Sequence, residues 1–232
     1  MNGVERGSDS EQTGRGKSVE PRETEQKKAG LEDSRAVDIL TTEHWSLLST
    51  RTLGYQEMFG RATIFIGVLS GTVIALALLA QATNFGREAL SFAVLLISVA
   101  LFIGIVTFVR SVAINIEDAR WVEGMNLLRD AYLKIVPELE PFFVSRIERD
   151  AQRRALAHGS PQHLRNLAYS LTTTSGVVAV LNSVLGGALA SDLSALFGAR
   201  LAPVVAIGVV VSLVSAILHV RYAARARRRH AP

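Results

Sequence analysis

Two pairs of long apolar segments constrain this chain more than any other feature of its sequence. The first pair covers residues 62–81 and 90–109, and the second covers residues 171–190 and 201–220. Each segment has about the twenty residues that an α-helix needs to cross the hydrocarbon core of a bilayer, and none contains Asp, Glu, Lys or Arg. We therefore predict an all-α integral membrane protein whose four transmembrane helices form two hairpins with cytoplasmic helical extensions.

The distribution of arginine predicts how these hairpins are oriented. The expected connections, residues 82–89 and 191–200, each carry one Arg and one acidic residue. The segments before, between and after the two pairs are rich in Arg. Because Arg and Lys near the ends of spans favour the cytoplasmic side, we expect both termini and the middle segment to be cytoplasmic.

The third apolar segment, residues 171–190, is the weakest of the four because Thr, Ser, Gly and Asn interrupt it. If it alone failed to span, the arginines of the C-terminus would lie outside, against the charge rule. We therefore expect four spans, with two spans as the alternative to four and three spans disfavoured.

The chain divides into five regions. The first, residues 1–36, is polar and is predicted to be disordered, because it cannot bury enough apolar surface to offset the entropy of ordering. Thr41 or Thr42 is the expected N-cap of the first helix. The other regions are the first hairpin with its cytoplasmic helices (37–136), cytoplasmic linker helices (137–168), the second hairpin (169–220) and a basic cytoplasmic tail (221–232).

Two amphipathic patterns flank the first hairpin. Before it, Trp45, Leu48, Thr52, Tyr55 and Phe59 recur at helical spacing, which indicates a helix that lies along the inner membrane surface or packs on the middle segment. After it, a heptad seam predicts a coiled coil with another helix, in a helix that continues from the second span to Pro137. The seam residues are Trp121, Met125, Leu128, Tyr132 and Ile135.

Small residues recur at four-residue spacing in all four apolar segments. Such residues let membrane helices approach closely, so we expect them at helix contacts, within one copy or between copies; a functional gate is the lesser alternative. They are Gly67, Gly71, Ala100, Gly104, Ala179, Ser183, Gly187, Gly208, Ser212 and Ala216.

Asn182 is the most polar residue deep in any of the apolar segments. We expect its amide to form a hydrogen bond with another helix, with a place on a conduction path as the alternative. The lack of charged residues in the spans argues against ion-coupled transporters and voltage sensors, which need such groups.

No catalytic, cofactor or metal site is predicted from the sequence. The chain has no Cys, and it lacks the Gly-x-Ser-x-Gly and His-Glu-x-x-His motifs. Glu117 and Asp118 follow the second span and are expected on a solvated helix face; binding of a cation or a basic partner is the alternative.

The C-terminal tail predicts contact with anionic lipid headgroups. It carries Arg225, Arg227, Arg228 and Arg229 directly after a span, where each Arg near a membrane surface contributes on the order of 1 kcal/mol. No aromatic stacking surface accompanies these residues, so we expect no nucleic-acid partner.

Five short stretches carry a resemblance to other proteins. They are residues 40–48 (LTTEHWSLL), Glu57-x-Phe59-x-Arg61, residues 75–83 (ALALLAQAT), residues 117–121 (EDARW) and residues 137–141 (PELEP). Through them, residues 40–145 resemble a group of uncharacterised, actinobacterial-like multi-span membrane proteins. The resemblance implies a bacterial origin and a multi-pass place in the inner (cell) membrane, and it implies no activity.

These observations favour a non-enzymatic inner-membrane protein, a scaffold or partner-binding protein that forms homo-oligomers or binds a protein through the Trp121–Ile135 seam. A pore-forming or membrane-perturbing effector is the main alternative, with Asn182 near the conduction path. A membrane enzyme with a site around Glu117, Asp118 and Arg120 is the least favoured hypothesis.

Overall fold

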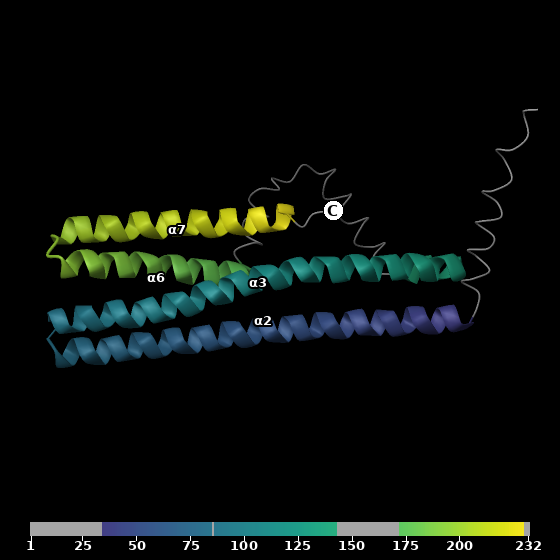
Figure 1. The fold of residues 1–232 in the computed structure, drawn as a ribbon, viewed down its shortest axis with the longest axis horizontal. Coiled ribbons are helices and arrows are strands. Elements are labelled where there is room, and N and C mark those ends of the chain that lie inside the picture. The colour runs from purple at the N-terminus through teal and green to yellow at the C-terminus, as the bar shows by residue number, and fades with distance from the viewer. Residues whose placement is uncertain (1–33, 85, 143–171, 230–232) are drawn as a thin grey trace, which may run out of the picture.

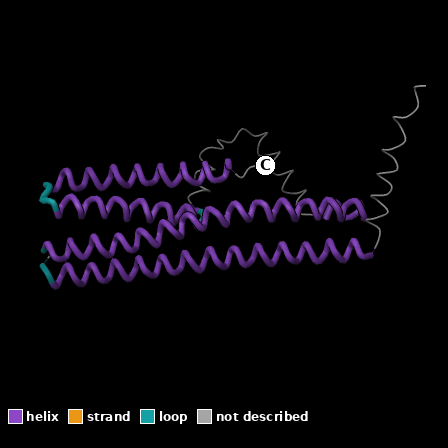
Figure 2. The backbone as a smooth tube through the Cα atoms, viewed as in Figure 1, coloured by secondary structure: helices purple, strands orange, loops and turns teal. Residues whose placement is uncertain are grey.

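The computed structural model describes residues 34–84, 86–142 and 172–229, and within them it contains helices and no strands (Figure 2). This confirms the all-α prediction. Four helices are long and apolar enough to cross a membrane. They are α2 (Ser34–Ala82), α3 (Arg87–Ile135), α6 (Thr174–Leu196) and α7 (Leu201–Arg229). A short 3-10 helix, η1 (Pro137–Phe142), follows α3.

The long helices form two hairpins, α2–α3 and α6–α7, whose short connections lie at the same end of the molecule (Figure 1). We call this the loop end. The side chain of Arg87 links the two connections there, because its Nη2 donates to the carbonyl oxygen of Leu196 at 3.1 Å. The hairpins are therefore side by side with the same direction of entry, as the four-span prediction requires.

The second connection is shorter than predicted. α6 continues through Asp192 to Leu196, and the turn comes only at Gly198, which has φ +83°. The N–H of Gly198 bonds to Ala195 O, and the N–H of Ala199 bonds to Ser194 O, which is the Schellman arrangement that a glycine after a helix end permits. The expected start of the loop at residue 191 is thus wrong, because polar residues at 191 and 192 do not stop a helix.

The spatial order of the helices places α3 at the centre. α3 packs against both α2 and α6, while α7 packs chiefly on α6 (Figure 1). The buried core follows α3 from Ala93 to Val112 and includes Phe65 of α2 and Val178 of α6. α7 has a single buried residue, Gly208, so most of its apolar surface is left to the surroundings, as lipid contact requires.

α2 and α3 are much longer than a bilayer is thick. Each has 49 residues and therefore extends for about 70 Å, against about 30 Å of hydrocarbon. Most of the excess forms a two-helix projection beyond the ends of α6 and α7 (Figure 1). We call residues 34–61 of α2 and 110–135 of α3 the stalk; its base still lies beside α6, where Asn115 donates to Ser175 Oγ at 3.1 Å. The prediction that α3 runs without a break to Pro137 agrees with this structure.

Thr41 and Thr42 do not cap α2, which already begins at Ser34; Thr42 Oγ1 instead donates to Asp38 O at 2.8 Å inside the helix. α7 continues as a helix to Arg229, so the basic residues are not a separate tail. The predicted linker helices over residues 143–168, and nearly all of the predicted disordered N-terminus, lie outside the described residues.

The hairpin plan predicts which positions share one side of a membrane. Because the chain lacks Cys, single cysteines can be labelled without background. Cysteines replacing Gln81 and Ala199, both exposed at the loop end, should react with an impermeant maleimide on the same side of the membrane. Cysteines replacing Asp130 and Arg229, both exposed away from the loop end, should react only after permeabilisation. Labelling of residues 81 and 199 from opposite sides would contradict the two-hairpin arrangement.

Candidate functional site

The heptad seam of α3 is covered by α2 of the same chain. A Cβ added to Gly54 would lie 2.9 Å from Trp121 Cζ3, so the indole lies directly on the α2 backbone. Met125 is 4% exposed, and the rings of His44 and Tyr132 make an edge contact with centroids 6.3 Å apart. Leu128, Tyr132 and Ile135 are half-buried. The expectation that this seam is free to dock a protein partner is therefore wrong. α2 does pack on the middle segment, but not through the predicted stripe, because Leu47 and Gly54 lie against α3 instead. The stripe residues Trp45, Leu48, Thr52 and Phe59 are exposed, and only Tyr55 is half-buried.

Ion pairs fasten the stalk where α2 and α3 leave the apolar segments. Arg110 of α3 donates two hydrogen bonds to the Glu57 carboxylate of α2, from Nη2 to Oε2 at 2.7 Å and from Nε to Oε1 at 2.9 Å. Arg61 donates to the same carboxylate at 2.9 Å. Arg110 also reaches Glu117 through Nη1 at 3.2 Å. Parallel bonds between guanidinium and carboxylate are among the stronger ionic contacts in proteins.

A second ionic contact lies two turns further along the stalk. Arg51 Nε donates to Asp118 Oδ1 at 2.6 Å, and Tyr55 Oη donates to Asp118 Oδ2 at 3.1 Å. The guanidinium of Arg51 also lies 5.6 Å from the centroid of the Tyr55 ring. Glu117 and Asp118 thus bind arginines of their own chain, and the prediction of a merely solvated face for them is wrong.

The electrostatics of this cluster keep its groups charged. Hydrogen bonds from Arg110 and then Arg61 lower the pKa of Glu57 from 4.5 to about 2. The hydrogen bond to Asp118 raises the pKa of Arg51. Each acid of the cluster is paired with a guanidinium: Glu57 and Glu117 with Arg110, and Asp118 with Arg51. Among the described residues, no three His, Cys, Asp or Glu side chains gather as a metal site would require.

Asn182 lies at the centre of the apolar core and is 0% exposed. It faces the backbone of α3 at Gly104, where an added Cβ would overlap its Oδ1 and would lie 2.7 Å from the ring of Phe65. Neither amide atom of Asn182 forms a hydrogen bond with the described residues. The expected hydrogen bond to a neighbouring helix is therefore not made, because the surfaces it meets are a glycine and a phenyl ring.

The small residues divide into four groups. Gly187 and Gly208 let α6 and α7 cross closely: a Cβ on Gly187 would overlap Ser212 Oγ, and one on Gly208 would overlap Ser191 Oγ. Ala100, Gly104 and Ser183 are buried in the core around α3. Gly67 and Gly71 lie on open surface with nothing within 4 Å of an added Cβ. The expectation that they pack against another helix of the same copy is therefore wrong. Ala179 and Ala216 line a groove between α6 and α7.

Comparison with protein-family models, curated proteins and solved structures found no match for this chain. The resemblance of residues 40–145 to uncharacterised bacterial membrane proteins therefore stays a prediction.

Gly104 should be essential for close packing, whereas Gly67 should not. Gly104→Ala forces a methyl group against Asn182 and Phe65, and overpacking of this kind costs about 1–3 kcal/mol. We expect a lower unfolding midpoint in detergent for Gly104→Ala and no decrease for Gly67→Ala, which adds the same methyl group on open surface. Equal midpoints for the two variants would contradict the packing described here.

The ion pairs of Glu57 should survive mild acid. Because the folded-state pKa lies below the ordinary value of 4.5, the stabilisation is complete above about pH 4.5 and is lost as the pH falls toward 2. We expect the difference in unfolding midpoint between the wild type and Glu57→Gln to stay constant from neutral pH to about pH 5, and then to shrink. A difference that vanishes already above pH 5 would show that the pairs do not hold.

Proposed function

We propose that the chain is a non-enzymatic, self-assembling membrane scaffold in which α2 pairs with α2 of a second copy. The observation that carries this proposal is the outer side of α2, the side turned away from α3. Residues there recur with alternating steps of three and four, as in a coiled coil, and all are exposed. They are Ser46, Ser49, Leu53, Gln56, Gly60, Thr63, Gly67, Ser70 and Ile74.

The composition of this stripe suits contact with an identical helix. It contains no charged residue, so two copies would meet without repulsion between like charges. Gly60 and Gly67, seven residues apart, have open space where a side chain would be, which lets two backbones approach closely in lipid. Two chains in one bilayer present the stripe in the same direction, so a parallel, two-fold symmetric pair is the simplest assembly.

The stalk continues this surface out of the membrane. Leu53 and Trp45 are 64% and 63% exposed, although α3 already covers the opposite side of α2. Apolar groups of this size are unfavourable in water by about 25 cal/mol per Å² of apolar surface. A second stalk would cover Leu53, and the paired stalks would still present other exposed groups, such as Phe142 at the end of η1, to a cytoplasmic protein partner.

The pore-forming alternative rests on Asn182, whose amide has no partner among the described residues. In a single copy Asn182 is fully buried, with Gly104 and Phe65 beside it. A conduction path through one copy would have to separate these helices, whereas self-assembly requires no change in the chain. The scaffold is therefore the function that the geometry supports better.

Self-assembly can be tested with single cysteines in native membranes. Gly60→Cys and Gly67→Cys should form disulfide-linked dimers on mild oxidation, because they would lie at the contact between two copies. Leu127→Cys, 67% exposed on α3, should not, since it faces away from that contact. Cross-linking of Leu127→Cys as readily as Gly67→Cys would mean random collision and would overturn the proposal.

A steric variant gives an independent measurement. Gly67→Leu fills the open space on α2 and should reduce the dimer fraction, measured by energy transfer between labelled copies, by about tenfold. Val73→Leu enlarges a residue that is 59% exposed outside the stripe and should leave the dimer fraction unchanged. Unchanged energy transfer in Gly67→Leu would contradict pairing through this face.

A further inference from the structure

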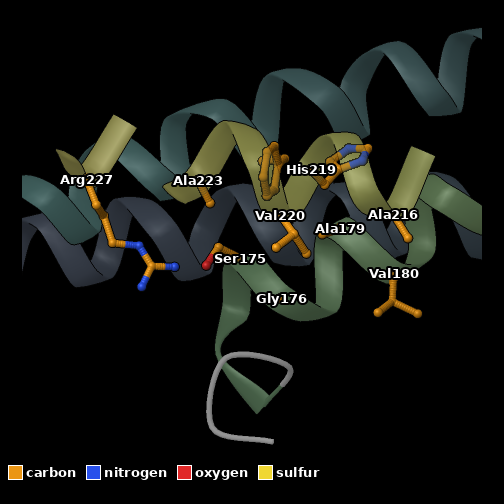
Figure 3. A pocket seen from close by; sticks show the side chains of 10 residues that line it. Ser175, Gly176, Ala179, Val180, Ala216, His219, Val220, Ala223 and Arg227 are labelled. Atoms are coloured by element: carbon orange, nitrogen blue, oxygen red, sulfur yellow. The ribbon is translucent and has the colours of Figure 1, made fainter. Parts of the chain in front are cut away.

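A groove opens between α6 and α7 near the ends of these two helices that lie away from the loop end (Figure 3). It exists because the two helices meet there through very small residues, Gly176 and Ala179 on α6 and Ala223 on α7. Phe108 of α3 forms part of its lining. The volume is about 100 Å³, which is small beside the ~300–1,000 Å³ of sites for drug-sized molecules. The groove has room for a chain rather than for a ring system.

Contacts among the lining residues and with Ser215 fix the shape of the groove. The rings of Phe108 and His219 meet edge to face with centroids 4.6 Å apart. His219 Nδ1 lies 2.7 Å from Ser215 O, which holds the imidazole on α7. The lining is therefore set before any ligand arrives, and a preformed site saves the ordering cost of binding.

The two ends of the groove differ in polarity. Arg227 and Ser175 lie at one end, and Val180 and Ala216 lie at the other (Figure 3). No acidic side chain is found among the described lining residues. Arg225 and Arg228 add further positive charge on the same turns of α7. The ligand that fits such a groove has an apolar tail and an anionic head.

The position of the groove relative to the bilayer indicates where such a ligand comes from. Ala216 belongs to the apolar segment 201–220, and Arg227 lies eleven residues further along α7, or about 16 Å. The apolar end is thus at the depth of the hydrocarbon and the arginine at the depth of the headgroups. A long Arg side chain beside a span reaches toward phosphate at this level.

We propose that this groove is a binding site for an anionic phospholipid. One acyl chain lies between α6 and α7, against Ala179, Ala216 and Phe108. The phosphate contacts the guanidinium of Arg227. Ser175 also lines the groove, and its Oγ accepts a hydrogen bond from Asn115 Nδ2 at 3.1 Å. The site is on the opposite hairpin from the α2 stripe, so it does not depend on self-assembly.

Two pairs of variants test the proposal by native mass spectrometry of protein taken from nanodiscs of phosphatidylglycerol and phosphatidylcholine. Arg227→Gln should lower the retention of phosphatidylglycerol by about fivefold, while Arg229→Gln, which removes the same charge outside the lining, should not. Ala216→Phe should also reduce retention because it fills the groove. Ala206→Phe, on an exposed position of α7, is its control. Circular dichroism establishes that each variant is folded; if Ala216→Phe is not, Ala223→Leu replaces it.

Three results would overturn the proposal. Equal losses in Arg227→Gln and Arg229→Gln would mean general attraction to an anionic surface. Full retention in a folded groove-filled variant would mean that no acyl chain occupies the groove. Displacement of phosphatidylglycerol by excess inorganic phosphate would mean that the arginine binds the phosphate group alone. None of these outcomes bears on the cross-linking of α2, so failure here and failure of the scaffold proposal are distinguishable.

Discussion

The uninterrupted course of α3 is the constraint on which the rest of the structure depends. One helix of 49 residues contacts α2 along the stalk, and it contacts α6 through the core. It therefore sets the position of both hairpins relative to each other. The stalk and the membrane core are therefore built on two parts of one continuous helix.

Different forces stabilise helix packing at the two ends of α3. In lipid, apolar side chains gain nothing from leaving the solvent, so helices associate through close backbone contact and van der Waals packing. Gly104, Gly187 and Gly208 provide that contact. The stalk is surrounded by water, so the hydrophobic effect acts there. Larger side chains such as Trp121 and Met125 therefore pack against α2. The ion pairs of Glu57 and Arg110 lie where the apolar segments end and the stalk begins. Charged groups are still solvated there, but solvent screens their interaction less than it would in bulk water.

The sequence was sufficient for the features that depend on local pattern. The apolar segments, the hairpins and the continuation of α3 to Pro137 all follow from hydropathy and from the positions of helix breakers. The sequence patterns were insufficient for features that depend on how α2 and α3 are aligned along each other. Arg51 and Asp118 are about equally far from the α2–α3 turn, as are Glu57 and Arg110, so an antiparallel hairpin brings each pair together. That symmetry about residues 83–86 was the signal that could have identified the partners of Glu117 and Asp118.

Asn182 shows why residue type alone did not determine the local contact. A buried amide is expected to find a partner because an unsatisfied one costs about 1–3 kcal/mol, yet the helix opposite offers Gly104, whose backbone groups are engaged within α3. The close approach that Gly104 permits is what places the amide against the backbone and the Phe65 ring. Packing of the helices therefore took precedence over pairing of the amide.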